Sequence, residues 1–362
     1  MKVAILIRNL KQFGGGEKDV VVLTEGLNEA GITPDIFSEQ EATSQEIENY
    51  FGKKINFKVR PFPRPSGNLS RVMAEIFLSH PLKTKLEDYD FVYDFTNKPP
   101  VYRRSKKYLK YIYIIDDKRV LEKSASRNFQ SKLYRFLANL GFSKFNKISN
   151  DIINVTQSEY VQKEIKKSAG ESVPIVYPPV EMDQQSIDSF ERSNSVISLG
   201  RFSPEKNQLE QLQIAKKLPE INFIIIGIKD DQEYFNQIKK FKTENKVDNV
   251  SLIENASKQK VQELLRSSKV FLNTTKNEHF GLSTVEAIAA GCLPLAHKSG
   301  GQVEILENDE FLFETMDEAI IKLSILQKSS PDEYQNKIKS LQGKIEKYNE
   351  EGFKEKLLAY LK

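Results

Sequence analysis

The sequence predicts an α/β protein made of two Rossmann-like domains. The chain has 362 residues, more than one hydrophobic core usually supports, so two domains are expected. In both halves, short β-branched and aromatic runs alternate with amphipathic stretches, which is the rhythm of a parallel sheet with crossover helices. A polar stretch without periodicity separates the two series, as expected where one domain ends and the next begins.

The first predicted domain covers residues 1–180. A helix is predicted over 20–30, and Ser158 has the character of a helix N-cap. The apolar runs predicted as strands are 3–7, 36–37, 91–93, 111–115 and 152–155. These alternating elements predict a parallel sheet with helices packed on it.

The chain changes character after Tyr177-Pro178-Pro179-Val180. The polar residues 181–194 are interpreted as a linker. A second domain is predicted over 195–345, with strands at 196–199, 223–226, 250–253, 270–272 and 293–296. Because open α/β sheets bind ligands beyond the carboxyl ends of their strands, two such domains facing each other predict a deep cleft.

Composition indicates which partners the protein meets. The net charge is +4, yet residues 101–150 hold 13 Lys and Arg against three acids, a net charge of +10. Such a segment predicts contact with an anionic membrane surface or a phosphorylated acceptor, with a solvated helical face as the alternative. No nucleic-acid-binding module accompanies the charge, so nucleic acid is not an expected partner.

The expected location is the cytoplasm. The first strand follows Met1 without a charged leader, and no run of about 18 apolar residues predicts a membrane-spanning helix. The lone Cys292 is typical of a reducing compartment and reads as a small buried side chain. Peripheral attachment to the inner face of the membrane stays open.

A glycine-rich loop follows the first predicted strand. Phe13-Gly14-Gly15-Gly16-Glu17 leads into a helix, so Gly15 and Gly16 let backbone amides approach an oxyanion. The loop lacks the spacing of a nicotinamide fingerprint and the Gly-Lys-Ser/Thr of a P-loop, so neither a dehydrogenase nor an NTPase is supported. We interpret it as a loop close to a phosphate.

Two cations follow the first strand of the second domain. In Leu199-Gly200-Arg201-Phe202-Ser203-Pro204-Glu205-Lys206-Asn207, Arg201 lies at the strand end and Lys206 in the first helical turn. The helix dipole disfavours a cation there, which indicates a functional reason. Guanidinium and ammonium groups at one sheet edge are suited to a diphosphate, and two surface cations are the alternative.

The strongest signal is a pair of glutamates across a helix start. The run Asn277-Glu278-His279-Phe280-Gly281-Leu282-Ser283-Thr284-Val285-Glu286 places Glu278 before the helix and Glu286 inside it. The intervening amides of Gly281, Leu282 and Ser283 would form a helix N-terminus, which is an anion site. Glu286 lies among small apolar residues, where a buried carboxylate needs a partner such as two ribose hydroxyls.

This combination resembles glycosyltransferase family 4, the retaining group 1 transferases of the GT-B fold. The resemblance covers nearly the whole chain. It includes Gly14-Gly15-Gly16-Glu17, Arg201 with Lys206, Glu278 with Glu286, and Ser299-Gly300-Gly301 followed by Glu304. Residues 346–362 are similar to the last helix of the family, which returns to the first domain.

The resemblance implies roles for the matched residues. Arg201, Lys206 and Glu278 are the implied catalytic residues, the cations neutralising the departing diphosphate and Glu278 contacting the donor sugar. The implied donor-binding residues are Gly15, Gly16, Gly200, His279, Phe280, Gly281, Leu282, Ser283 and Glu286. Side-chain charge replaces a metal in this family, so neither a metal nor a cofactor is expected.

A finer likeness predicts the donor. The segments 277–281, 289–291 and 296–301 are similar to the dolichol-pathway mannosyltransferases of the family, which extend a lipid-linked core oligosaccharide from GDP-mannose. The predicted reaction is therefore transfer of a hexose, with mannose favoured, from a nucleotide diphosphate sugar to a glycan or lipid-linked acceptor. A UDP-sugar transferase of the same fold and a noncatalytic sugar-nucleotide-binding subunit are the alternatives.

One departure concerns the first domain. Many relatives have a histidine near the end of the strand that here reads Tyr111-Ile112-Tyr113-Ile114-Ile115-Asp116-Asp117, and this chain has none there. Asp116 is the candidate replacement, and otherwise this region serves only the acceptor. No comparably specific motif in the first domain predicts the acceptor or the linkage.

Overall fold

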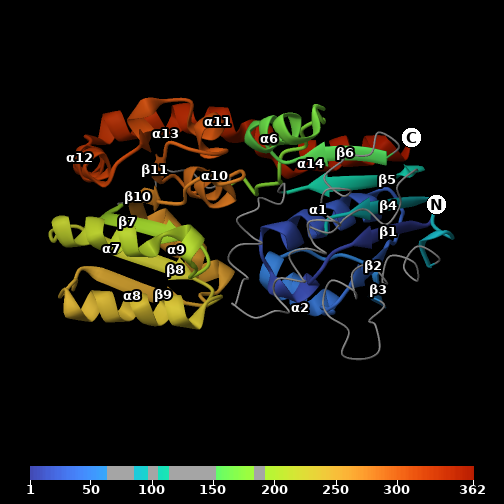
Figure 1. Cartoon of the computed structure of the whole chain (residues 1–362), viewed down its shortest axis with the longest axis horizontal. Helices are drawn as coiled ribbons and strands as arrows, with labels where there is room; N and C mark the ends of the chain where they lie inside the picture. Colours follow the sequence, from blue (N-terminus) through green and yellow to red (C-terminus); the bar gives the residue numbers. More distant parts are fainter. Residues whose placement is uncertain (63–84, 97–104, 114–151, 183–191) are drawn as a thin grey trace, which may run out of the picture. The chain divides into compact units, whose positions relative to one another are not determined.

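The computed structural model describes residues 1–62, 85–96, 105–113, 152–182 and 192–362. The chain divides into two compact units, one of Met1–Pro179 with Glu351–Lys362 and one of Val180–Glu350. Each unit is built on a six-stranded sheet (Figure 1). The strand pairs in both sheets are parallel. The predicted α/β class with two Rossmann-like domains is therefore confirmed.

The sheet of the first unit has the order β3-β2-β1-β4-β5-β6. Its strands are β1 (Val3–Leu6), β2 (Asp35–Ser38), β3 (Lys58–Pro61), β4 (Phe91–Asp94), β5 (Ser105–Ile112) and β6 (Ile152–Thr156). Its helices are α1 (Gly15–Glu29), α2 (Ser44–Phe51), α6 (Glu159–Ala169) and α14 (Glu350–Leu358), with 3₁₀ turns η1 (Leu10–Gln12) and η6 (Ala359–Leu361). The strand order reverses between β1 and β4, so the loops that follow these strands diverge there and leave room for a ligand.

Two strands of this unit differ from the sequence prediction. The strand expected at 111–115 is β5, which starts earlier and ends at Ile112. Its charged Lys110 is buried because the ammonium pairs with Asp94 of β4 at 2.9 Å. Strand β3 was not predicted, because it is a largely exposed edge strand whose Arg60 pairs with Asp35 of β2.

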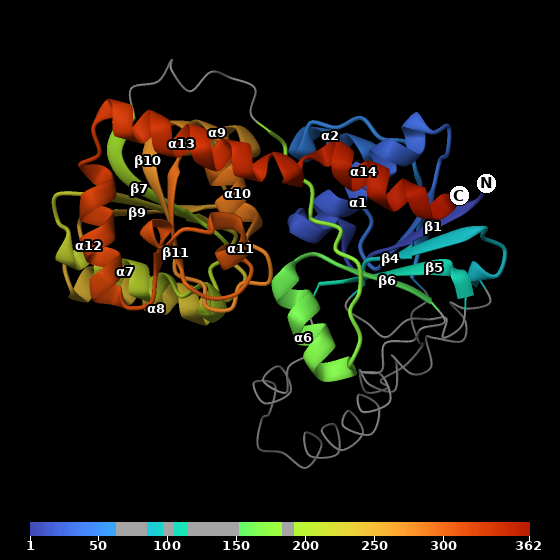
Figure 2. The ribbon, with the colours of Figure 1, turned by 90° about the horizontal axis from the view of Figure 1, so that it is seen from above.

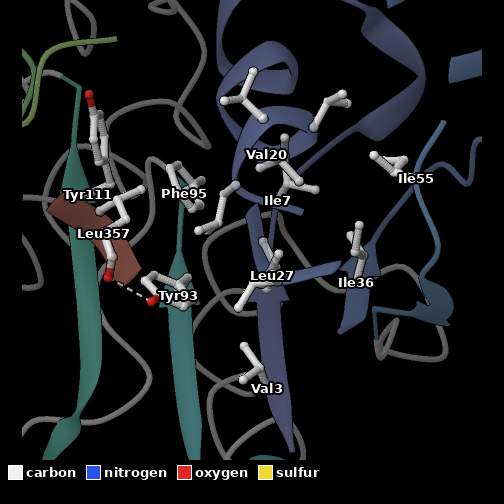
Figure 3. Packing of buried hydrophobic residues seen from close by; sticks show 14 of the residues in the cluster. Val3, Ile7, Val20, Leu27, Ile36, Ile55, Tyr93, Phe95, Tyr111 and Leu357 are labelled. Atoms are coloured by element: carbon white, nitrogen blue, oxygen red, sulfur yellow. Dashed lines mark hydrogen bonds between the residues drawn. The ribbon is translucent and has the colours of Figure 1, made fainter. Parts of the chain in front are cut away.

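Helices α1, α2 and α14 cover one face of the first sheet (Figure 2). Leu27 of α1 and Leu357 of α14 belong to one buried cluster with Ile36 and Tyr93 of the sheet. Figure 3 shows this cluster and the 2.8 Å hydrogen bond that the Tyr93 hydroxyl donates to the Leu357 carbonyl. The final residues of the chain are thus part of the core of the first unit.

The sheet of the second unit has the order β12-β11-β10-β7-β8-β9. Its strands are β7 (Ser193–Leu199), β8 (Asn222–Gly227), β9 (Val250–Glu254), β10 (Ser268–Asn273), β11 (Leu293–His297) and β12 (Leu312–Phe313). The five predicted strands lie inside β7 to β11. The ends of the predicted linker 181–194 differ from the structure. The second unit already begins at Val180, and β7 begins at Ser193. Residues 183–191 of the linker lie outside the described residues.

Helices pack on both faces of the second sheet. One face carries α7 (Gln208–Lys217), α8 (Gln232–Glu244) and α12 (Met316–Gln327), and the other carries α9 (Lys258–Ser267), α10 (Leu282–Ala289) and α13 (Pro331–Ile345) (Figure 2). Four short elements complete the unit: the helix α11 (Gln302–Leu306) and the 3₁₀ turns η3 (Pro204–Lys206), η4 (Asp309–Phe311) and η5 (Glu346–Tyr348). Sheets covered on both faces have apolar strands, which is why these runs were predictable.

Three further expectations concern the surface and the core. Among the described residues, no helix has the length and apolar character needed to cross a bilayer. Of the basic segment 101–150, only 105–113 are described, so its contact with an anionic surface stays a prediction. Cys292 is a buried free cysteine, and burial raises the pKa of its thiol to about 12.

Candidate functional site

The carboxyl edge of the second sheet collects the residues singled out by the sequence. The ends of β7 and β8 approach closely there, since the Gly200 amide donates to the Ile226 carbonyl at 3.0 Å. A Cβ atom on Gly227 would lie 2.1 Å from the Gly200 carbonyl oxygen. Glycine is therefore required at Gly227, where β8 ends beside the end of β7.

Lys206 and Glu278 meet at this edge. Lys206 is the last residue of the 3₁₀ turn η3 and precedes α7, so the predicted place in the first turn of that helix is wrong. Its Nζ lies 2.5 Å from Glu278 Oε2. The Lys206 side chain is 22% exposed and that of Glu278 is 15% exposed. Thr274, which follows β10, donates from Oγ1 to the carbonyls of Lys206 and Asn207 at 3.1 and 3.2 Å. The structure thus joins two predicted catalytic residues that are 72 positions apart in sequence.

The ion pair fixes the charge of Glu278. Burial alone would raise the pKa of this carboxyl group, but the Lys206 ammonium outweighs burial and holds the pKa below its ordinary value. Glu278 is therefore a carboxylate at neutral pH. Burial lowers the pKa of the neighbouring His279, while the charge of Glu278 raises it and that of Lys206 lowers it further. The His279 imidazole is therefore neutral at neutral pH.

Arg201 takes other partners. Its guanidinium pairs with Glu205 at 3.0 Å and with Asp230 at 3.0 Å, and its side chain is 44% exposed. The structure therefore does not place this guanidinium on the Lys206–Glu278 pair. Because exposed ion pairs contribute little free energy, a diphosphate would displace the two carboxylates at small cost.

Helix α10 begins directly beyond Glu278. Gly281 takes a left-handed conformation, with φ of 115°, and the helix starts at Leu282. Beneath this start lies a buried polar network that the sequence did not reveal: Asn273 donates to Thr284 Oγ1 at 3.3 Å, and Thr284 donates to Gln302 at 2.9 Å. These bonds hold the amides of the first turn, including Leu282 and Ser283, at a fixed place on the sheet edge.

Gly300 and Gly301 lie against the backbone segment that carries Glu278. The Gly301 amide donates to the Glu278 carbonyl at 2.7 Å, and Glu278 and Gly300 form a parallel bridge. A Cβ atom on Gly300 would lie 2.2 Å from the Glu278 carbonyl oxygen, and its φ is 73°. The neighbouring Phe280 is buried against Tyr348, with ring centroids 5.1 Å apart. Two backbone segments are thus locked together around Glu278.

Glu286 lies one turn inside α10 and is half-buried. The sequence predicted a carboxylate buried among small apolar residues, and this prediction is wrong, since the side chain is partly accessible. Its neighbours Val285 and Ala287 are fully buried. Glu286 therefore faces away from the core, where a ligand can reach it.

The glycine-rich loop of the first unit is already capped. Gly14 is the N-cap of α1, and its amide donates to the Glu17 carboxylate at 2.9 Å. Gly15 and Gly16 form the first turn of the helix, and a Cβ atom on Gly16 would lie 3.5 Å from the Tyr113 hydroxyl. An anion at this turn would have to share it with Glu17. Asp116, the candidate replacement for the missing histidine, lies outside the described residues.

Asp19, one turn further along α1, is fully buried and accepts from the Tyr113 hydroxyl at 2.6 Å. Burial raises its pKa to about 8, although the Tyr113 hydrogen bond opposes the rise. The folded state then keeps a proton that the unfolded state loses above pH ~4, so stability declines as pH rises from about 4 to 8.

We expect Asp19→Asn to remove this loss. Asparagine keeps an acceptor for Tyr113 and carries no titrating group, so the variant should gain stability over the wild type by about 1.4 kcal/mol per pH unit between pH 5 and 8. Urea unfolding at several pH values measures the difference. Parallel stability curves for the two proteins would contradict a protonated Asp19.

Comparisons with known proteins identify similar sequences and similar folds. Residues 180–342 match the family model described as glycosyl transferases group 1. A protein of Dictyostelium discoideum named GDP-Man:Man(3)GlcNAc(2)-PP-Dol alpha-1,2-mannosyltransferase is 28% identical over 260 residues, which is 65% of this chain and 50% of that protein. The mouse protein of the same name is 34% identical over 150 residues, 36% of this chain and 30% of the relative. The chain thus spans about half the length of the Dictyostelium relative, and less of the mouse one.

Solved structures share the fold over the whole chain. WaaG, a glycosyltransferase involved in lipopolysaccharide biosynthesis, has a TM-score of 0.76 at 14% identity and covers 99% of both chains. HepE of Anabaena, in complex with UDP and glucose, has a TM-score of 0.71 at 16% identity, covering 100% of this chain and 99% of its own. At these identities the likeness concerns the fold, which is the GT-B fold predicted from the sequence.

Proposed function

We propose that this protein is a retaining glycosyltransferase that moves a hexose from a nucleotide diphosphate sugar to a glycan or lipid-linked acceptor, because residues 180–342 match the family model described as glycosyl transferases group 1. The observation that carries the proposal is the Lys206–Glu278 ion pair, 2.5 Å long, at the carboxyl edge of the second sheet. It stands four residues before a helix N-terminus whose amides suit a phosphate.

Each group has a distinct part in the proposed reaction. The donor diphosphate accepts from the Lys206 ammonium and the first amides of α10, and Arg201 exchanges Glu205 and Asp230 for phosphate oxygens. As the bond to the anomeric carbon breaks, negative charge gathers on the diphosphate and is stabilised by these cations. Glu278 contacts hydroxyls of the donor sugar, and Glu286 holds the ribose.

Retention follows if the acceptor hydroxyl attacks from the face that the diphosphate leaves. The departing phosphate oxygen then takes the proton of that hydroxyl. In this proposal two side-chain cations supply the positive charge that a divalent metal would otherwise bring, so activity persists without added metal. Within the described ranges, no group of three or more His, Cys, Asp or Glu is arranged for a metal ion.

Mannose from GDP-mannose is the favoured donor. The support is the name shared by the Dictyostelium and mouse relatives, which are 28% identical over 260 residues and 34% identical over 150 residues. A UDP-sugar is the alternative, since HepE binds UDP and glucose on the same fold. For the acceptor we propose a lipid-linked glycan reached at the cytoplasmic face of a membrane, supported by the +10 net charge of residues 101–150.

A nucleotide panel followed by turnover tests the proposal. A ligand that binds only the folded state raises the melting temperature, so GDP should raise it more than UDP or ADP at equal concentration, with EDTA present throughout. GDP-mannose and a polyprenyl-linked oligosaccharide should then yield an axially linked, α-configured product. A larger shift with UDP would move the donor assignment to a UDP-sugar, and binding without transfer to any acceptor would support the noncatalytic subunit instead.

A further inference from the structure

A short chain of hydrogen bonds lies behind Glu278. The imidazole Nδ1 of His297, at the end of β11, is 2.9 Å from the hydroxyl of Ser299. The same hydroxyl oxygen accepts from the Asn277 amide at 2.8 Å. Because Asn277 directly precedes Glu278, the side chains of His297 and Ser299 act on the backbone that places the carboxylate.

The backbone at Asn277, to which these hydrogen bonds lead, adopts a conformation that costs free energy. Asn277 has φ of 54°, a left-handed conformation that side-chain-bearing residues rarely adopt. The Ser299 hydroxyl satisfies its amide at that turn, and the Ser299 amide in turn donates to the His297 carbonyl at 2.7 Å. Removing the hydroxyl would leave the strained turn without this bond, although the Glu278–Gly300 bridge would remain.

The direction of the bonds depends on the imidazole. With a neutral ring whose Nδ1 is an acceptor, Ser299 donates to Nδ1 and accepts from Asn277, so both of its bonds are satisfied. A protonated ring would donate to the same oxygen, and the hydroxyl hydrogen would lose its partner. Burial lowers the pKa of His297, as does Lys276, while Glu210 and Glu314 raise it. The ring of Phe313 packs edge-on against it at 5.5 Å.

We propose that His297 and Ser299 are positioning residues that hold Glu278 opposite Lys206 through the Asn277 turn, and that they hold it most firmly while the imidazole is neutral. The proposal deepens the proposed transferase function and rests on it. Neither side chain needs to touch the donor. Their contribution is to turnover, since they fix the carboxylate that faces the reacting sugar.

Variants at His297 and Ser299 test whether these residues position Glu278. Ser299→Ala and His297→Phe should each lower kcat about tenfold, the loss expected for one hydrogen bond of about 1.4 kcal/mol, while the donor KM changes less than twofold. His297→Asn keeps a polar atom near the Nδ1 position and should recover most of kcat. Ser324→Ala removes a half-buried serine hydroxyl bonded to the Ile320 carbonyl on α12 and serves as the matched control.

The pH profile separates positioning from a general structural role. The wild type should lose kcat as His297 becomes protonated below neutral pH, and His297→Asn should lack this acid limb. Equal acid limbs in both proteins, or unchanged kcat in Ser299→Ala, would overturn the proposal.

Amide exchange at Asn277 gives a readout that does not require turnover. Ser299→Ala should speed exchange at this amide, with Ser324→Ala like the wild type. Unchanged exchange at the Asn277 amide in Ser299→Ala would overturn the proposed positioning role, even if the wild type is an active enzyme. Faster exchange in Ser299→Ala, together with a wild type that transfers no sugar, would instead count against the proposed function alone.

Discussion

Lys206→Ala is expected to lose about a hundred- to a thousandfold in turnover while staying folded. Removal of one preorganised group that stabilises developing charge typically has this effect. The Lys206 ammonium is held at a fixed place by its 2.5 Å pair with Glu278 and by the hydrogen bond that Thr274 donates to the Lys206 carbonyl. Water entering the site would not reproduce that charge. Steady-state kinetics with saturating donor and acceptor measure the loss.

Lys260→Ala is the matched control for this substitution. Lys260 pairs with Glu263 at 2.7 Å on the surface of α9, and both side chains are well exposed. An exposed pair contributes at most about 1 kcal/mol to stability, so this variant should keep wild-type turnover. Thermal unfolding shows whether Lys206→Ala is folded. A folded Lys206→Ala protein with more than a third of wild-type turnover would contradict the proposed role.

The second unit was the more predictable one. Its strands β7 to β11 are apolar runs because helices cover both faces of the sheet, and apolar runs of that length predict buried parallel strands. In the first unit, β5 contains Lys110, whose burial depends on Asp94 of a neighbouring strand. No local pattern reveals such a pairing, since it exists only after the strands have met.

The candidate site divides in the same way. Glu278 on one side of a helix start and Glu286 inside the helix could be placed from sequence, because glycine and the following helix pattern define where α10 begins. The partners could not be placed. Lys206 finds Glu278 across 72 residues, whereas Arg201 binds Glu205 and Asp230 beside it. Residue type predicted the chemistry, and tertiary contacts decided which cation meets which acid.

Glu278→Gln should separate the two functions of the Lys206–Glu278 pair. Glutamine keeps the shape and one acceptor oxygen but removes the charge that faces the donor sugar. We expect kcat to fall about a hundredfold, the lower end of the loss for one electrostatic group. The donor KM should stay equal or decrease, because Lys206 no longer shares its charge with a carboxylate and binds the diphosphate more strongly.

A double-mutant cycle with Lys206→Ala gives the coupling between the two residues. Groups that act as one unit are not additive, so the double variant should be little worse than Lys206→Ala alone. Glu263→Gln and its double variant with Lys260→Ala form the matched cycle on the exposed pair of α9, where the losses should be negligible. Fully additive losses at Lys206 and Glu278 would mean that the two side chains act independently of each other once the donor is bound. The ion pair would then be a feature of the ligand-free protein that substrate binding separates.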